Sequence, residues 1–359
     1  MPRAADLGIR IGTMPGGPSD TVLDVPGVGV GHATVRRDEP DPPHGRGVAR
    51  TGVTVLDPGG NGFREPVPAG GAVLNGAGEC TGFLSAAEWG LVETPVFLTN
   101  TMQVGRVYDA ACELLMAEDP GIGAEDVVIP VVAECDDSFL NDSRRMQVTA
   151  EDVAAALREA RGGGLPAEGA VGSGTGMSCL GYKGGIGTAS RVTPDGHTLG
   201  VLLMSNFGER GRLTVDGVPV GRLLAPPGPP EAAVPRPAGS CIVLVITDAP
   251  VDPAGCQRLA RRAGLGLART GSTAHHASGE IFLAMATGLR AARGTAPAAT
   301  PLQGRELDPL FAGVVDATEE AVLNSLLQAE NVTGRAGNTS YALPAADVVR
   351  LLRAHGRLP

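Results

Sequence analysis

The stretch RPAGSCIVLVITDAP, residues 236–250, joins two kinds of chain. Before it, residues 224–239 (LAPPGPPEAAVPRPAG) carry five prolines between positions 226 and 235 and show no hydrophobic periodicity, which is typical of a linker or a surface loop. After Gly239 a continuous apolar run begins, which predicts a buried strand over residues 241–247. Ser240 therefore stands at the start of a core strand, directly after a glycine and a proline-rich segment.

The composition limits the class of protein. The 359 residues are 43% hydrophobic but only 3% aromatic, so a large core must be built from Ala, Val, Leu and Ile. A net charge of −10 without a basic stripe argues against a nucleic-acid partner. The first residues show no apolar core typical of a signal peptide, so we expect none, no apolar run reaches membrane-spanning length, and the six cysteines lack CxxC spacing. We therefore expect a cytoplasmic protein with free thiols and no membrane partner.

Short apolar runs alternate with helical patterns, which predicts an α/β fold. We expect strands at residues 53–56, 72–74, 96–99, 127–132, 198–205 and 241–247. We expect helices at residues 104–117, 151–161, 255–268, 317–330 and 345–355. Thr149 and Asp152 form a capping-box pattern for the second of these helices. The segments after the linker look too interleaved in pattern to stand alone, so we expect one domain spanning residues 1–359.

Ser240 at a chain break would have a defined chemistry. A serine with a free α-amine can use that amine as its base, because the amine has an ordinary pKa of about 7.7–8.0. To create this amine, the Ser240 hydroxyl would attack the Gly239 carbonyl, and an N→O acyl shift followed by hydrolysis would cut the chain. Glycine at position 239 would permit the strained backbone that such an attack needs. Gly-Ser pairs also precede ordinary strands, so these residues alone leave both interpretations open.

Five blocks of the sequence resemble one known family. They are DVPGVGVGHATV (24–35), TGVTVLDPGGNGFREPVPAGGAVLNGAGECTG (51–82), ETPVFLTNTMQVG (93–105), GSGTGMSCLGYKGGIGTASRV (172–192) and AVLNSLLQAENVTGRAGNTSYALP (321–344). Together with GSCIVLVITDAP (239–250) they follow the order found in the L-aminopeptidase/D-esterase and β-peptidyl aminopeptidase family. The members of that family are self-processing serine hydrolases of the N-terminal-nucleophile type, and the resemblance spans nearly the whole chain.

The resemblance assigns catalytic roles to four residues. Ser240 matches the nucleophile that follows the self-cleaved Gly239–Ser240 bond. The motif HHASGE matches the family's Ser-Gly-Glu, and it implies that Ser278 bonds the nucleophile or its amine while Glu280 holds Ser278 or favours the protonated amine. The motif MSNFG matches the oxyanion segment and makes Asn206 the oxyanion donor.

Substrate binding is implied for a second segment, VVAECDDSFLND (131–142). By the resemblance, Glu134 binds the free amino group of the substrate. Asp136 stands where some relatives carry an aromatic hydroxyl near the oxyanion, and Ser138 replaces a family glycine. Glu79 also stands where we expect a basic or polar residue. The spacing of Asp136 and Glu134 predicts that both carboxylates lie on one face of a strand, and this extra carboxylate would favour a substrate with a second positive charge. The alternative is that Asp136 points to solvent and only Glu134 matters, and Glu79 marks a second position where specificity could differ.

The resemblance also implies the architecture and the partners. It predicts a four-layer α-β-β-α sandwich that is cut into residues 1–239 and 240–359, with the two pieces remaining together as a homotetramer. Substrates would be short peptides, amino-acid amides or esters, including D- or β-amino acids. No metal or other cofactor is expected.

Three alternatives remain open at this point. A relative of the same fold could hydrolyse ω-amino-acid oligomers such as nylon fragments, although those enzymes use a threonine nucleophile. Ornithine acetyltransferase shares the architecture, but its threonine-initiated motif is absent from this chain. The chain could also be a catalytically silent ligand-binding protein, which would never be cut.

Overall fold

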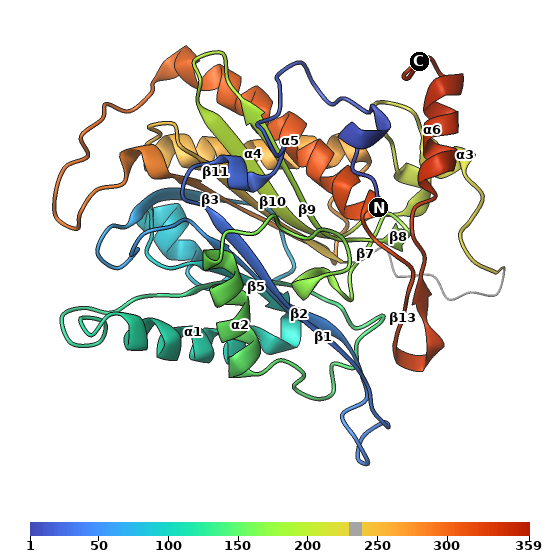
Figure 1. Cartoon of the computed structure of the whole chain (residues 1–359), viewed down its shortest axis with the longest axis horizontal. Coiled ribbons are helices and arrows are strands. Elements are labelled where there is room, and N and C mark those ends of the chain that lie inside the picture. Colours follow the sequence, from blue (N-terminus) through green and yellow to red (C-terminus); the bar gives the residue numbers. More distant parts are fainter. Residues whose placement is uncertain (230–238) are drawn as a thin grey trace.

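The computed structural model describes residues 1–229 and 239–359 and consists of stacked layers of helices and sheets (Figure 1). Within these residues, a four-stranded sheet has the order β1 (Gly29–Asp38), β2 (Val48–Asp57), β5 (Val96–Asn100), β6 (Val131–Cys135). A six-stranded sheet has the order β4 (Leu91–Val92), β3 (Val67–Gly76), β12 (Gly279–Ala286), β11 (Ser240–Thr247), β10 (Thr198–Asn206), β9 (Gly185–Val192). Two small ribbons pair β7 (Ser178–Cys179) with β8 (Tyr182–Lys183) and β13 (Val332–Thr333) with β14 (Thr339–Ser340).

Helices cover the outer face of each sheet. The four-stranded sheet carries α1 (Val104–Glu118) and α2 (Ala150–Arg161), and the six-stranded sheet carries α4 (Pro253–Thr270) and α5 (Asp308–Leu327) (Figure 1). The shorter helices α3 (Val220–Leu223) and α6 (Ala345–Ala354) lie beside each other at the periphery. This arrangement is the four-layer α-β-β-α sandwich that the sequence resemblance predicts. Every helix in the described parts of the chain is too short or too polar to span a lipid bilayer.

The strand of the opening stretch, β11, lies in the middle of the larger sheet and is buried along its whole length. Its side chains alternate between two hydrophobic layers, as the period of two in a strand requires. Ile242 and Leu244 belong to the cluster between the sheets, whereas Cys241 and Val243 belong to the cluster under α4 and α5. Ser240 is in phase with Ile242 and thus faces the space between the sheets, away from Cys241.

Most predicted elements are present, and the differences have local causes. The capping box of α2 is present, with the Thr149 side chain accepting from the Asp152 amide. The strand predicted at 127–132 begins only at Val131, because Pro130 lacks the amide hydrogen that a sheet ladder uses. The helix predicted at 317–330 instead spans Asp308–Leu327. It is buried on nearly all sides, so its sequence lacks the amphipathic pattern that would mark its first turns. Residues 230–238 of the predicted linker lie outside the described part of the chain.

Candidate active site

Three strands of the six-stranded sheet meet at the start of β11. Ser240 lies opposite Asn206, the last residue of β10, and opposite Gly279, the first residue of β12. The Gly279 amide donates to the Gly239 carbonyl oxygen at 3.2 Å and to Ser240 Oγ at 3.3 Å. Ser240 is only 4% exposed. The residue proposed as nucleophile therefore lies in a buried, polar corner, and the carbonyl that it would attack is already hydrogen-bonded.

Glycine is required at position 239 for a steric reason. A Cβ built on Gly239 would lie 1.6 Å from the carbonyl oxygen of Asn206, which is part of the neighbouring strand. The close approach of β10 to the peptide before Ser240 therefore selects glycine at this position.

The amide side chain of Asn206 is held in a fixed orientation. Its Oδ1 accepts from the Ser178 backbone amide at 2.9 Å, and its Nδ2 donates to the Asp136 carbonyl at 2.7 Å. A Cβ on Gly239 would lie 3.0 Å from the same Nδ2, so the Asn206 amide stands beside the Gly239–Ser240 peptide. An Nδ2 group carries two hydrogens, and one of them remains for an oxyanion.

Ser278 and Glu280 form a buried pair on either side of Gly279. The Ser278 hydroxyl donates to Glu280 Oε1, and Glu280 Oε2 is buried with no hydrogen-bond partner among the described residues. Burial raises the pKa of the Glu280 carboxyl, although the hydrogen bond from Ser278 lowers it. The pair is brought next to Ser240 through Gly279, but no hydrogen bond between Ser278 and Ser240 is present in the described part of the chain.

Glu134, the last residue but one of β6, is a buried carboxylate that is 2% exposed. Its Oε1 accepts from the Glu79 backbone amide at 2.9 Å, and its Oε2 accepts from the Thr101 hydroxyl. Burial raises the pKa of Glu134, the two hydrogen bonds lower it, and the charges of Asp136 and Glu79 raise it again. A Cβ on Gly78 would lie 3.1 Å from Glu134 Oε1 and 3.7 Å from Gly279 Cα, so a single glycine separates Glu134 from the Ser240 corner.

Asp136 differs from the position that its spacing predicts. β6 ends at Cys135, so Asp136 lies in the following loop rather than on the strand with Glu134. Its side chain is exposed and accepts from the Ser138 amide at 2.8 Å, while its main-chain carbonyl holds Asn206. Its charge nevertheless acts on Glu134. Asp136 therefore contributes its backbone to one part of the site and its charge to another.

Two supporting residues have contacts that the sequence does not predict. The Asn75 amide donates to the carbonyls of His275, His276 and Ser278 and so fixes the turn before β12. Lys183, the single lysine of the chain, is fully buried, and its Nζ donates to the carbonyls of Gly174, Met177 and Gly184. That segment carries Ser178, which holds Asn206. Asn75 and Lys183 both stand inside sequence blocks of the resemblance, but their roles depend on backbone contacts that a pattern does not reveal.

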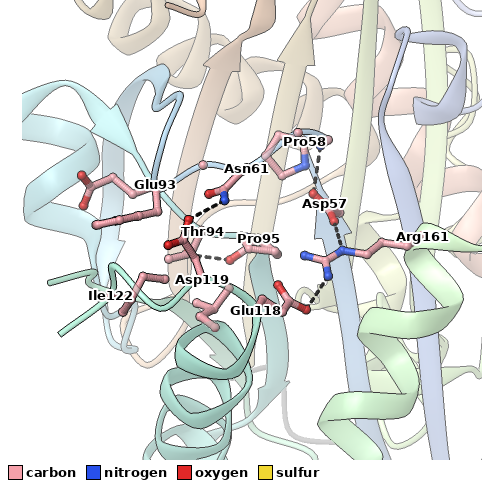
Figure 2. Close-up of a pocket in the computed structure, with 15 residues that line it drawn as sticks. Asp57, Pro58, Asn61, Glu93, Thr94, Pro95, Glu118, Asp119, Ile122 and Arg161 are labelled. Atoms are coloured by element: carbon pink, nitrogen blue, oxygen red, sulfur yellow. Dashed lines mark hydrogen bonds and ion pairs between the residues drawn. The ribbon is translucent and has the colours of Figure 1, made fainter. Parts of the chain in front are cut away.

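A separate pocket of about 290 Å³ lies at the other end of the four-stranded sheet, where β2 ends and β5 begins (Figure 2). Its acidic side chains have partners within the protein. Arg161 pairs with Asp57 at 2.9 Å and with Glu118, and Asn61 donates to Asp119 at 2.9 Å (Figure 2). These pairs satisfy the charges without a ligand, and the pocket contains none of the residues that the sequence assigns to catalysis.

Comparison with known proteins places this chain and its fold in one family. The model of peptidase family S58 matches residues 20–340. The β-peptidyl aminopeptidase of Sphingosinicella xenopeptidilytica is 39% identical, with 98% of this chain and 91% of that protein covered. Among solved structures, a β-aminopeptidase of Burkholderia sp. superposes with a TM-score of 0.89 at 40% identity, covering both chains completely. The L-aminopeptidase D-Ala-esterase/amidase of Ochrobactrum anthropi, described as a variant of the Ntn hydrolase fold, gives a TM-score of 0.90 at 35% identity, again over both whole chains.

These similarities confirm the resemblance, the layered fold and the hydrolase class expected from the sequence. They concern the whole length of the chain rather than one motif, and they do not by themselves assign a role to any single residue. By sequence and by fold, the chain belongs to peptidase family S58.

Proposed function

We propose that this chain is a self-processing serine aminopeptidase in which Ser240 forms the acyl-enzyme. The observation that carries the proposal is the Gly239–Ser240 peptide itself. It is buried at the start of β11, its carbonyl accepts from the Gly279 amide at 3.2 Å, and the same amide contacts Ser240 Oγ at 3.3 Å. The names of the relatives suggest β-amino acids, L-amino acids and D-alanine esters or amides as N-terminal groups to test.

In this proposal each residue of the corner has one task. After self-cleavage, the free amine of Ser240 takes the proton of the Ser240 hydroxyl, and Oγ attacks the substrate carbonyl. The free hydrogen of Asn206 Nδ2 stabilises the oxyanion, and comparable donors contribute about 10²–10³-fold to the rate. The Ser278–Glu280 pair sits beside the new amine and favours its protonated form during the transfer. Water then hydrolyses the ester and regenerates Ser240.

The two pieces, residues 1–239 and 240–359, would remain one folded unit. β11 and β12 come from the second piece, but they lie between β3 and β10 of the first piece in the same sheet. Separating the pieces would open this sheet and both hydrophobic layers beside it. A homotetramer in the cytoplasm, acting on small substrates without nucleic acid, completes the proposal.

Recognition of the substrate amine is assigned to Glu134, and Glu134→Gln tests the function. The substitution removes the charge but keeps the shape, so we expect KM for amino-acid p-nitroanilides to rise about tenfold or more, which is the loss of a charge-assisted hydrogen bond. Self-cleavage should continue, because Glu134 does not contact the Gly239–Ser240 bond. The measurement is steady-state kinetics on free-amine and N-acetylated p-nitroanilides.

The pH dependence of KM tests the role of the Glu134 carboxylate independently. Only the ionised carboxylate attracts an ammonium group, and the folded enzyme raises the pKa of Glu134. In the parent enzyme KM should therefore rise as the pH falls through a value above the ordinary pKa of about 4.3, and this limb should vanish in the glutamine variant. Cleavage of acetylated substrates as fast as free ones by the parent enzyme would disprove the assignment.

The charge of Asp136 should favour a second positive group on the substrate. We expect kcat/KM for Arg-p-nitroanilide relative to Ala-p-nitroanilide to fall about three- to fivefold in Asp136→Asn, which is the scale of an exposed ion pair. Glu151→Gln, an exposed carboxylate at the start of α2, serves as the control and should leave the ratio unchanged. If the ratio of the two kcat/KM values were unchanged in Asp136→Asn, Glu134 would bind the substrate's positive charge without a contribution from Asp136.

A further inference from the structure

The backbone amide of Gly279 occupies a position that the reaction on a substrate does not explain. It donates to the carbonyl oxygen of Gly239 at 3.2 Å, and this oxygen belongs to the bond that the proposed self-cleavage breaks. The same N–H lies 3.3 Å from Ser240 Oγ, the atom that would attack that carbonyl. One donor thus contacts both the nucleophile and the oxygen on which negative charge would develop.

The sequence and the register place this amide there. β11 and β12 run parallel with Ser240 opposite Gly279, so the ladder hydrogen bond at this level falls on the scissile peptide. Gly279 lacks a side chain for a steric reason, because a Cβ would lie 2.4 Å from the Ala77 carbonyl oxygen. The donor is therefore part of two packed backbones and needs no rearrangement when charge develops. Gly239 and Ser240 are both buried, and a fixed donor acts most strongly where water is excluded.

Asn206, by contrast, is oriented by other groups. Its Nδ2 donates to the Asp136 carbonyl and its Oδ1 accepts from Ser178. In the described part of the chain, no hydrogen bond joins Asn206 Nδ2 to the Gly239 oxygen. The donor for the substrate oxyanion and the donor on the scissile carbonyl are thus different groups on opposite sides of β11.

We propose that the Gly279 N–H is the oxyanion donor of self-cleavage, distinct from the Asn206 amide that serves substrate turnover. In this step, which rests on the proposed function, Ser240 Oγ forms a bond to the Gly239 carbonyl carbon, and the C=O electron pair moves to the oxygen held by Gly279. The tetrahedral adduct collapses as the Gly239–Ser240 C–N bond breaks, and the hydroxyl proton ends on the Ser240 nitrogen. Water then hydrolyses the ester to give the Gly239 carboxylate and a free Ser240 hydroxyl.

The test removes the N–H without adding a side chain. Nonsense suppression in a cell-free translation can incorporate glycolic acid in place of Gly279. This substitution replaces the backbone N–H of residue 279 by an ester oxygen and adds no side chain. The matched control places leucic acid at Leu283, which is paired with Leu244 further along the same two strands. Self-cleavage, followed on denaturing gels, should slow about 10²–10³-fold for the ester at 279 and only a few-fold for the ester at 283. Thermal unfolding of both chains shows whether the fold is kept.

Each outcome has one meaning. If the ester at 279 is cut at the rate of the control, the Gly279 N–H is not the donor and the inference is wrong. If Asn206→Ala slows self-cleavage as much as the ester at 279, one oxyanion donor serves both reactions and the inference is also wrong; we expect a smaller effect on self-cleavage together with loss of p-nitroanilide turnover. If the unmodified chain is never cut at Gly239–Ser240, the proposed function itself fails.

Discussion

Ser240→Ala should remain a single, folded, inactive chain, whereas the parent enzyme separates into two fragments on a denaturing gel. The second fragment should begin Ser-Cys-Ile-Val. The same hydroxyl is the nucleophile in self-cleavage and in substrate turnover. Its removal should therefore abolish self-cleavage and reduce kcat about 10⁶-fold, which is the scale of losing the nucleophile of a serine hydrolase. Intact-mass measurement and p-nitroanilide kinetics on the same preparation provide both readouts.

Cys241→Ala is the matched control for that experiment. Cys241 is the neighbouring residue, it is equally buried, and it could be considered a rival nucleophile. Its side chain belongs to the cluster under α4 and α5, and burial raises the pKa of its thiol well above the usual value, so it is not a thiolate. The variant should therefore be cut and should turn over substrate. Fragments in Ser240→Ala, or a single band in the active parent enzyme, would contradict the proposal and would favour a different cleavage site or a silent ligand-binding protein.

The sequence predicted the layers better than it predicted the contacts inside the site. Continuous apolar runs and capping signals depend on neighbours along the chain, so β11 and the capping box of α2 could be read directly. β1 and β9 were missed, and both are interrupted by glycines, which carry no hydrophobic signal. In β9, a Cβ on Gly187 would collide with the backbone of α5, so the glycine marks a close contact between layers.

In the candidate site too, the sequence reveals distinctive side chains but not the contacts that depend on the register of the strands. Resemblance could name Ser240, Asn206 and Ser278 because each is a chemically distinctive side chain in a recognisable motif. The Gly279 amide could not be found that way, because every residue except proline has one and only the register of β11 against β12 makes this one special. Asp136 was placed on a strand with Glu134 because residues two apart share a face in a strand, but β6 ends before it.

The second large effect is expected from Gly239→Ala, although alanine adds only one methyl group. That methyl would lie 1.6 Å from the Asn206 carbonyl oxygen, and a backbone atom of a strand that is paired with β11 cannot move away as a flexible side chain can. The strand start must therefore shift by an ångström or more. Displacing the reacting atoms by this distance lowers a reaction rate about 10²-fold. We therefore expect self-cleavage to slow by at least that factor and the uncut chain to accumulate.

The control for Gly239→Ala is Gly211→Ala, because a Cβ at that position would meet nothing within 4 Å. Both variants lose one glycine near the end of β10, so they share any general effect of reducing backbone freedom in the unfolded chain. Only the change at 239 is expected to push the start of β11 away from Asn206 and to displace the Gly239 carbonyl from the Gly279 amide. If Gly239→Ala were cut as fast as Gly211→Ala, the close approach of β10 would have no part in positioning the scissile bond. Cleavage that is slow in Gly239→Ala, with thermal stability close to that of the control, would locate the effect in the geometry of the reacting atoms rather than in the stability of the fold.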